Sequence, residues 1–454
     1  MAAHDDLTDL ARRHLWMHFT RLGAYTDHDV PIIDRGDGCY VYDRHGRRYL
    51  DALSGLFTVQ VGHGRTELAE AAAEQASRLA YFPVWSFAHE PAITLAARLA
   101  AAAPGDLDRV FFTPSGGDAV ESAIKFARQY WRMTGRPSKY KVMSRYLAYH
   151  GTSLGALSLA GVPSIREPFE PLLPGAVKVR TPYRYRCDLC AAHDRCTLAC
   201  ADDLATRIEM EGPDTVAAVF MEPVQNTGGA FTPPDGYWSR VREICDEYDV
   251  LLVSDEVISA FGRFGEMFGS IRYGYQPDII TFAKGVTSGY APLGGMIVSE
   301  RLAEPFLTAT DVFLHGQTFG AHPVSCAVAN RNLDIFERED LCGRVRANEG
   351  HFKDLVSGLL DLPIVGDVRG DGYFLAIELV PDKQTKSLFS AEQSERLLRG
   401  LLSPQIYEAG LICRADDRGE PVITLSPPLI AGETEFTFIV DVLRDTLTRA
   451  SELL

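Results

Sequence analysis

The sequence has no long apolar run and no start that resembles a leader. No stretch of its 454 residues reaches the roughly 18 consecutive apolar residues that a membrane-spanning helix needs. Residues 1–9 are acidic and lack the apolar core of a secretory signal peptide. We therefore expect a cytoplasmic protein with mostly reduced thiols and no membrane partner.

Basic residues are also scarce. Lys and Arg number 45 against 61 Asp and Glu, which gives a formal net charge of −16. Nucleic acids and anionic membrane surfaces attract proteins with a basic patch, so this balance argues against both as partners. The hydrophobic fraction of 46% and the charged fraction of 23% are ordinary for a globular protein. The length allows about two or three domains.

Short apolar segments alternate with helical ones through the middle of the chain. Five of them are typical of buried strands: residues 110–113, 141–143, 216–221, 250–253 and 279–282. Strands that alternate with helices form a mostly parallel sheet with right-handed crossovers. The predicted fold class is therefore α/β, with this mostly parallel sheet at the centre of a large domain.

The segments on either side of this alternation have a different pattern. Ahead of it we expect a helix over residues 5–21 and a small meander over residues 31–51. After about residue 330, helices accompany separate short strands, which indicates a smaller α+β domain. We predict three parts: an N-terminal segment, 1–60, that contributes to the small domain, a large cofactor-binding domain, 61–330, and a C-terminal small domain, 331–454.

Two of the predicted strands lead to charges of opposite sign. The run 250–253 leads to Asp255, and the run 279–282 leads to Lys284. Ligands bind at the carboxyl ends of the strands in an open α/β sheet, so both side chains face one crevice if the strands are neighbours. A desolvated lysine has the lowered pKa that imine formation requires, and a carboxylate favours a protonated pyridine nitrogen. Our hypothesis is that Lys284 holds pyridoxal phosphate as a Schiff base and that Asp255 pairs with its ring nitrogen.

Three weaker signals fall at the same edge of the sheet. The turn Ser115-Gly116-Gly117 follows a strand and opens a helix, where backbone amides and the helix dipole bind phosphate. The alternative is a tight turn with no ligand. Tyr149 can stack on a flat ring, and Glu222 is a third acid that could instead cap the next helix.

Taken in order along the chain, these motifs resemble those of the class III aminotransferases, the pyridoxal-phosphate enzymes of fold type I. The resemblance covers about residues 40–426. It includes Asp255-Glu-Val-Ile-Ser-Ala-Phe-Gly, the segment 278–295 around Lys284, and His315-Gly-Gln-Thr-Phe-Gly. It implies a fold type I architecture, pyridoxal 5′-phosphate as the cofactor, and a homodimer with shared active sites.

The resemblance implies a role for each residue around the cofactor ring. Lys284 is the Schiff-base lysine and the general acid and base, and Asp255 pairs with the pyridine nitrogen. Val257 packs on one face of the ring, and Tyr149 stacks on the other. Glu222 lies in a second layer around the cofactor, together with Gln225.

The resemblance also implies how the phosphate is held. Ser115, Gly116 and Gly117 bind it, and Thr318 reaches the phosphate of the neighbouring subunit's cofactor. The family often has Ser or Thr where this chain has Gly117. One hydroxyl contact is therefore missing, although the backbone donor remains.

Departures from the family pattern bear on the substrate. Ornithine and 4-aminobutyrate members carry an acid where this chain has Thr227, so the chain looks more like the ω-amino acid or amine:pyruvate transaminases. In that subgroup a flexible arginine binds the acceptor's carboxylate and swings away for apolar amines, and Arg414 is at the matching place. Phe57 and Trp85 match the subgroup's aromatic pocket positions. Trp85 belongs to a dense aromatic loop, 81–87, which is either core packing or a pocket wall.

The function that the resemblance implies is a ping-pong transfer of an amino group from an amine or ω-amino acid to pyruvate or a similar keto acid. One alternative is another pyridoxal-phosphate reaction on the same fold: an aminomutase, racemase, decarboxylase or phospho-lyase. The other is a non-catalytic relative used for binding or regulation, which predicts a broken cofactor constellation.

Four of the nine cysteines gather in one short stretch: Cys187, Cys190, Cys196 and Cys200. Four thiolates can close a structural zinc site, although the second pair has a Cys-x3-Cys spacing. His193 is a spare ligand. Two disulfides or plain thiols are the alternatives. We expect these residues to take no part in catalysis.

Overall fold

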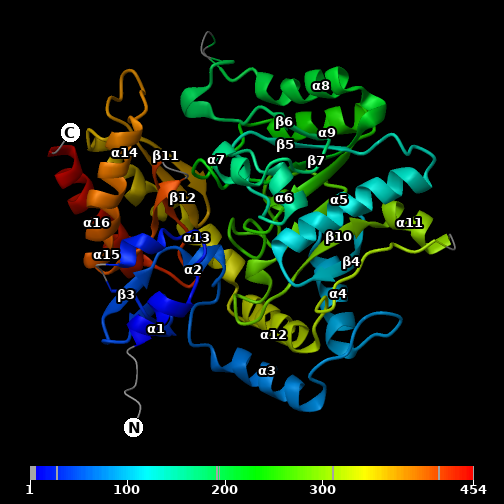
Figure 1. Ribbon diagram of the computed structural model, residues 1–454, viewed down its shortest axis with the longest axis horizontal. Helices are drawn as coiled ribbons and strands as arrows, with labels where there is room; N and C mark the ends of the chain where they lie inside the picture. The colour runs from blue at the N-terminus through cyan, green and yellow to red at the C-terminus, as the bar shows by residue number, and fades with distance from the viewer. Residues whose placement is uncertain are drawn as a thin grey trace.

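The computed structural model describes residues 7–26, 29–190, 193, 195–308, 311–417 and 420–452. In this part of the chain, one seven-stranded sheet forms the centre of a larger body, and two four-stranded sheets belong to a smaller body beside it (Figure 1). The predicted α/β class with a largely parallel sheet is confirmed. No helix among the described residues is long and apolar enough to cross a membrane.

The large sheet has the strand order β4-β10-β9-β8-β7-β5-β6. Its strands are β4 (Leu107–Thr113), β5 (Lys141–Arg145), β6 (Ala176–Val179), β7 (Val216–Met221), β8 (Leu251–Asp255), β9 (Ile279–Phe282) and β10 (Gly294–Ser299). The five strands from β9 to β6 run parallel to their neighbours, whereas β10 is antiparallel to both β9 and β4. Because β10 reverses the direction once on each side, β4 points the same way as the other five strands.

Helices cover both faces of this sheet, which is why β7, β8 and β9 are buried at every residue. Side chains alternate between the two faces of a strand. Phe220 of β7 packs with α5 (Gly116–Met133), α6 (Leu154–Leu159) and α11 (Glu300–Thr308). The next residue, Met221, packs with α8 (Ala199–Glu211) and α9 (Tyr237–Glu247) on the other face. A run of apolar residues without alternation is what such a doubly covered strand requires.

Three further helices pack together at one edge of the large body: α3 (Thr66–Arg78), α4 (Glu90–Ala102) and α12 (Pro323–Arg338). Helix α12 also carries the chain from the large body towards the small one (Figure 1). The remaining short helices are α2 (Ser54–Phe57), α7 (Pro163–Arg166) and α10 (Gly269–Arg272).

The small body joins the two ends of the chain. One of its sheets is antiparallel throughout, in the order β11 (Val365–Asp371), β12 (Phe374–Leu379), β15 (Glu420–Leu425), β14 (Arg414–Asp417). The other has the order β1 (Ile33–Asp37), β2 (Tyr40–Asp43), β3 (Arg48–Asp51), β13 (Leu411–Ile412). Its last pair, β3 and β13, is parallel and links the N-terminal meander to a C-terminal strand.

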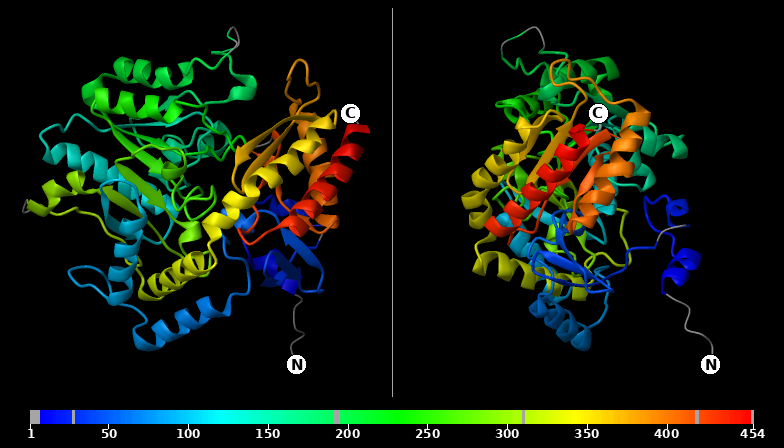
Figure 2. Two further views of the ribbon diagram at one scale, coloured as in Figure 1. Left: turned by 180° about the vertical axis from the view of Figure 1, so that it is seen from behind. Right: turned by 90° about the vertical axis from the view of Figure 1, so that its left-hand side faces the viewer.

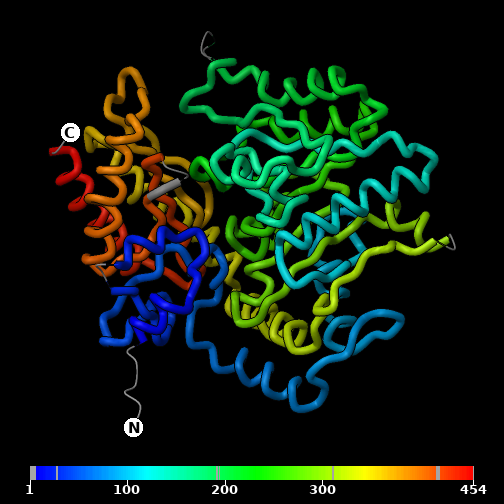
Figure 3. Tube along the Cα trace, viewed as in Figure 1, coloured from blue at the N-terminus to red at the C-terminus, as the bar shows by residue number. Residues whose placement is uncertain are grey.

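Four helices complete the small body: α13 (Leu341–Ser357), α14 (Ala391–Leu397), α15 (Ser403–Glu408) and α16 (Glu433–Glu452). The N-terminal strands and α16 lie together on one side of the molecule when it is seen from behind (Figure 2). The Cα trace shows the same proximity between the blue and the red ends of the chain (Figure 3). This pairing supports the proposed division into 1–60, 61–330 and 331–454, in which the first segment contributes to the small domain.

The predicted helix over residues 5–21 is wrong in its length. Helix α1 covers Leu7–His14 only. Beyond it, Trp16 is 80% exposed and Phe19 is 75% exposed with a positive φ of 52°. The apolar residues that made the segment look like one helix therefore have no core to pack against in the single chain.

Candidate active site

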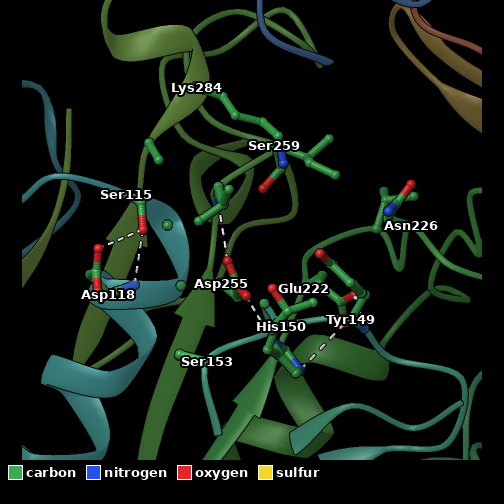
Figure 4. A pocket seen from close by; sticks show the side chains of 18 residues that line it. Ser115, Asp118, Tyr149, His150, Ser153, Glu222, Asn226, Asp255, Ser259 and Lys284 are labelled. Carbon is green, nitrogen blue, oxygen red and sulfur yellow. Dashed lines mark hydrogen bonds and ion pairs between the residues drawn. The ribbon is translucent and has the colours of Figure 1, made fainter. Parts of the chain in front are cut away.

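A pocket of about 270 Å³ opens at the carboxyl ends of five strands of the large sheet. Its lining residues follow β4, β5, β7, β8 and β9, and all five strands point towards it. This edge is where an open α/β sheet leaves room for a ligand, because the loops that follow its strands diverge there. Figure 4 shows the Lys284 side chain and the Asp255 carboxylate in this one pocket.

Lys284 enters the pocket from a strained turn. Strand β9 ends at Phe282, and Lys284 begins the 3-10 helix η5 (Lys284–Val286) with a φ of +47°. A side chain in this left-handed region costs roughly 1–2 kcal/mol, so surrounding contacts must hold it there. Asn332 of α12 supplies them by donating from Nδ2 to the carbonyls of Gly285 and Val286, at 2.9 Å and 3.0 Å. The turn therefore fixes the direction in which the lysine points.

Burial lowers the pKa of Lys284 from 10.5 to about 8. Within this net value, the Asp255 carboxylate raises the pKa of Lys284 and the positive charge of Arg414 lowers it. A share of this amine is consequently neutral near physiological pH, as a nucleophile or a base must be.

Asp255 is buried and held by three partners. Thr281 Oγ1 donates to Oδ1 at 3.1 Å, and the backbone amide of Val257 donates to the same oxygen at 3.2 Å. His150 Nδ1 lies 2.6 Å from Oδ2. Asp255 lies directly opposite Thr281 because β8 and β9 are parallel neighbours. The hypothesis that Asp255 and Lys284 face one crevice required these two strands to be adjacent.

His150 was missed by the sequence reasoning, although it follows Tyr149 directly. Its Nε2 atom is buried without a hydrogen-bond partner among the described residues and lies 3.9 Å from Glu222 Oε2. Glu222 in turn lies 3.2 Å from Arg145 Nη2 and accepts from the backbone amide of Tyr149 at 3.3 Å. Glu222 therefore positions the loop after β5 and lines the pocket as well (Figure 4). No motif or spacing in the sequence predicts a role for His150, because only the fold brings it next to Asp255.

The turn before α5 forms the opposite wall of the pocket. Ser115 is the N-cap of α5: its Oγ accepts from the Asp118 amide at 3.2 Å and donates to Asp118 Oδ2 at 2.7 Å. A Cβ atom at Gly116 would lie 2.9 Å from both methyl groups of Val257, so only glycine lets Val257 pack there. A Cβ atom at Gly117 would lie 3.8 Å from its nearest neighbour, Ser153 Oγ, so that position has room for a larger residue.

The residues present fit pyridoxal phosphate. The pocket offers a desolvated amine at Lys284, a buried carboxylate at Asp255 and the free backbone amides of a long helix at Gly116 and Gly117. These three suit an aldehyde, a protonated ring nitrogen and a phosphate respectively. Val257 and Tyr149 both line the space between these groups.

Two predicted substrate residues also converge on Lys284. The Arg414 guanidinium carbon lies 5.3 Å from the centroid of the buried Phe57 ring, and Lys284 Nζ lies 6.0 Å from the same ring. Arg414 donates from Nη2 to Asn226 Oδ1 at 3.3 Å. The sequence did not predict a role for Asn226, although it adjoins Thr227, which bears on the substrate. Its side-chain oxygen is one of the groups that hold this arginine.

Gln225 has a supporting position. It is buried, and its Nε2 donates to the Tyr146 carbonyl at 2.9 Å. Gln225 therefore ties the loop after β7 to the chain just after β5 and does not line the pocket itself.

Trp85 and Thr318 are not brought to the pocket of this chain. Trp85 is 61% exposed, and Tyr81 of the same loop donates its hydroxyl to the Thr318 carbonyl at 2.7 Å. The aromatic loop 81–87 thus lies on the surface beside the Thr318 segment. In the single chain the core-packing interpretation of this loop is wrong, because Phe82 and Phe87 are also exposed.

The four clustered cysteines lie outside this pocket. None of the nine cysteines, all of which belong to the described part of the chain, is in a disulfide. No group of three or more His, Cys, Asp or Glu side chains among the described residues is arranged to hold a metal ion.

Comparison with known proteins gives a family model and close relatives. The model for aminotransferase class-III matches residues 24–447. A probable aminotransferase of Mycobacterium tuberculosis is 57% identical over 97% of this chain and 94% of its own length. A putrescine–pyruvate aminotransferase of Pseudomonas aeruginosa is 36% identical over 97% of this chain and 96% of its own. The crystal structure of a thermostable (S)-enantioselective ω-transaminase from Thermomicrobium roseum has a TM-score of 0.92 at 41% identity, with 98% of each chain covered.

Proposed function

The chain belongs to the class III aminotransferases, and on that premise we propose that it moves an amino group from an amine or ω-amino acid to pyruvate or a similar keto acid, with pyridoxal phosphate bound at Lys284. The observation that carries the proposal is the meeting of the desolvated Lys284 amine with the Asp255 carboxylate at neighbouring strand ends, across from the first turn of α5.

The chain's own residues hold and orient the cofactor. When bound, pyridoxal phosphate supplies an aldehyde that exchanges amino groups and a ring that withdraws electrons from the substrate. The backbone amides of Gly116 and Gly117 hold its phosphate at the positive end of α5. Val257 and Tyr149, which both line the pocket, would pack on the ring. Asp255, kept in place by its three hydrogen-bond partners, sets a negative charge against the ring nitrogen.

Lys284 moves the proton. With a pKa of about 8, its amine can take the proton from the donor carbon that bears the nitrogen and give one back. The turn that Asn332 holds keeps Nζ directed into the pocket, so the amine is already oriented towards the substrate.

Arg414 recognises the carboxylate of the keto acid. A guanidinium pairs with a carboxylate through two parallel hydrogen bonds. Asn226 Oδ1 accepts one of the hydrogen bonds of Arg414, and we propose that this side chain turns away to leave Phe57 facing an apolar amine. The Pseudomonas aeruginosa relative, named for putrescine and pyruvate, supports this choice of substrates.

A homodimer completes each site. Trp85, Phe87, Leu314 and Phe319 are each at least 59% exposed and lie on segments near Thr318, which makes a surface that a second copy of the chain would cover. We propose that the partner's Thr318 then contacts the phosphate at Lys284 of this chain and that the partner's Trp85 approaches the substrate.

The half-reaction tests this function. Holoenzyme mixed with a donor alone, with no keto acid, should convert the cofactor from its aldehyde to its amine form, followed by absorbance. The panel is an aryl-alkyl amine, putrescine, β-alanine, 4-aminobutyrate and ornithine, each then chased with pyruvate. A cofactor that stays in the aldehyde form with every donor contradicts transamination and favours another reaction on this fold.

A further inference from the structure

The chain between β6 and α8 forms a second site of a different chemistry, well apart in sequence from every residue of the active-site pocket. A cavity of about 620 Å³ beside it is lined by all four clustered cysteines and by four basic side chains. These basic residues are Arg184, Arg186, Arg195 and Lys386. The proposed amino-group transfer uses none of them.

The four thiols differ in their surroundings. Cys200 is buried on α8, and burial raises its pKa to about 12. Burial also raises the pKa of Cys187. Cys190 is the exception: its Sγ accepts from the Thr197 amide at 3.4 Å and faces Thr197 Oγ1 at 3.4 Å. These contacts favour the thiolate and lower the pKa of Cys190 to about 7.

Cys196 is placed to be the partner of Cys190. It is exposed, and its Sγ lies 4.0 Å from Cys190 Sγ. A disulfide needs its sulfurs at about 2.05 Å, so the two side chains have to approach by about 2 Å. Neither cysteine belongs to a helix or a strand.

We propose that Cys190 and Cys196 form a reversible thiol–disulfide pair that hydroperoxides oxidise. The Cys190 thiolate attacks the distal peroxide oxygen, the O–O bond breaks, and hydroxide or an alkoxide leaves, so that Cys190 becomes a sulfenic acid. The Cys196 thiol then attacks Cys190 Sγ, forms the S–S bond and releases water. Two electrons pass from the two thiols to the peroxide, and two equivalents of a small-molecule thiol return them as they form their own disulfide.

The arrangement favours this chemistry over a structural zinc site. A closed zinc site needs four thiolates turned to one point. Here no group of three or more such side chains among the described residues is arranged to hold a metal ion.

Tryptic mapping tests the pair, because Arg186, Arg195 and Arg207 cut the segment into peptides 187–195 and 196–207. The native, reduced holoenzyme is treated with one equivalent of hydrogen peroxide at neutral pH, alkylated and digested. A Cys190–Cys196 disulfide joins the two peptides, whereas a Cys187–Cys190 disulfide stays within the first. We expect the joined species in the wild type and in both Cys187→Ser and Cys200→Ser.

Two further variants assign the roles. Cys190→Ser should lose the joined species and consume peroxide about tenfold more slowly. Cys196→Ser should keep the fast consumption and accumulate a sulfenic acid that a dimedone probe traps on peptide 187–195.

Two results would overturn the proposal. One is peroxide-treated wild type in which the two peptides stay separate. The other is native protein that carries one tightly held zinc per chain, with thiols that resist peroxide until a chelator removes the metal. The readout is the thiol chemistry itself, so failure here leaves the proposed amino-group transfer untouched.

Discussion

At the scale of single residues, the proposed amino-group transfer depends on the Lys284 amine. Burial lowers its pKa to about 8, and only the neutral amine captures an aldehyde. The rate at which apoenzyme captures pyridoxal phosphate should therefore rise with pH and level off above a midpoint near 8. Stopped-flow absorbance across a pH series measures it. A midpoint at the ordinary lysine value of 10.5 would contradict the desolvated environment.

Arg414 provides the control for that midpoint. Its positive charge lowers the pKa of Lys284, so Arg414→Gln should move the midpoint of capture to higher pH. Arg344→Gln removes a charge of the same sign at a residue that donates to the Ile430 carbonyl and is not among the charges that shift the pKa of Lys284, so it should leave the midpoint unchanged.

A second prediction about Arg414 concerns the KM of each substrate. Because it supplies a charged partner to the keto acid's carboxylate, Arg414→Gln should raise the KM for pyruvate by roughly tenfold or more. The KM for an aryl-alkyl amine, which has no carboxylate, should change little. Asn226→Asp gives Arg414 a negatively charged partner, which should hold the arginine in place. This variant should raise the KM for the apolar amine and change the KM for pyruvate little. Equal effects on both substrates in either variant would rule out the proposed movement of Arg414.

The two glycines before α5 form a matched pair. A side chain at Gly117 has room, since the nearest atom to its Cβ would be 3.8 Å away, and a serine there would add a hydroxyl donor for the phosphate. Gly117→Ser should bind pyridoxal phosphate about tenfold more tightly, the worth of one hydrogen bond to a charged group. Gly116→Ser should weaken binding, because its Cβ would press on Val257 at 2.9 Å. Titration of apoenzyme with cofactor measures both.

At the scale of elements, α5 has two tasks that one substitution can separate. Ser115 caps the helix through the Asp118 amide, so Ser115→Ala should lower the stability of the apoenzyme by about 1 kcal/mol. Ser115→Asp keeps the cap, since Asp is as good an N-cap as Ser, but sets a negative charge against the phosphate. Denaturant unfolding should therefore find the second variant as stable as the wild type, and cofactor titration should find its affinity reduced at least tenfold. Normal cofactor affinity in Ser115→Asp would remove α5 from the phosphate site.

Three of the strands that the sequence predicted correctly are determined by the pattern of burial alone. Strands β7, β8 and β9 are covered on both faces, so their apolar runs stand out without any knowledge of the fold. Strand β10 was not predicted because it begins with Gly294 and Gly295, and glycines weaken the strand pattern of a sequence. Those glycines are needed here: a Cβ at Gly295 would lie 2.6 Å from the Phe111 carbonyl of the adjacent strand.

The residues of the candidate site could likewise be predicted only where the local sequence determines them. Lys284 and Asp255 were predictable because each charge follows an uncharged strand. His150 and Asn226 are loop residues that acquire their roles only through partners distant in sequence, Asp255 and Arg414. The predicted helix over residues 5–21 failed for the converse reason, since its apolar residues Trp16 and Phe19 are exposed in the single chain.

At the scale of the whole molecule, the account requires that two chains share each site. Lys284→Ala and Thr318→Glu should each inactivate a homodimer, the first by removing the base and the second by setting a charge against the partner's phosphate. When the two variants are mixed and allowed to exchange subunits, each heterodimer should hold one intact site and one doubly damaged site. About a quarter of the wild-type activity should then return.

The controls for this mixing experiment are each variant alone after the same treatment, which should stay inactive. No recovery in a mixture that native mass spectrometry shows to contain heterodimers would place Thr318 outside the partner's site.

The claim that unites these scales is that Lys284 is the residue that carries the cofactor. Borohydride reduction of the native enzyme, followed by peptide mapping, tests it most directly because reduction makes the link permanent. We predict one pyridoxyl phosphate per chain, on Lys284, and none in Lys284→Ala. A label on any other lysine, or no label in enzyme that turns over amines, would contradict the account.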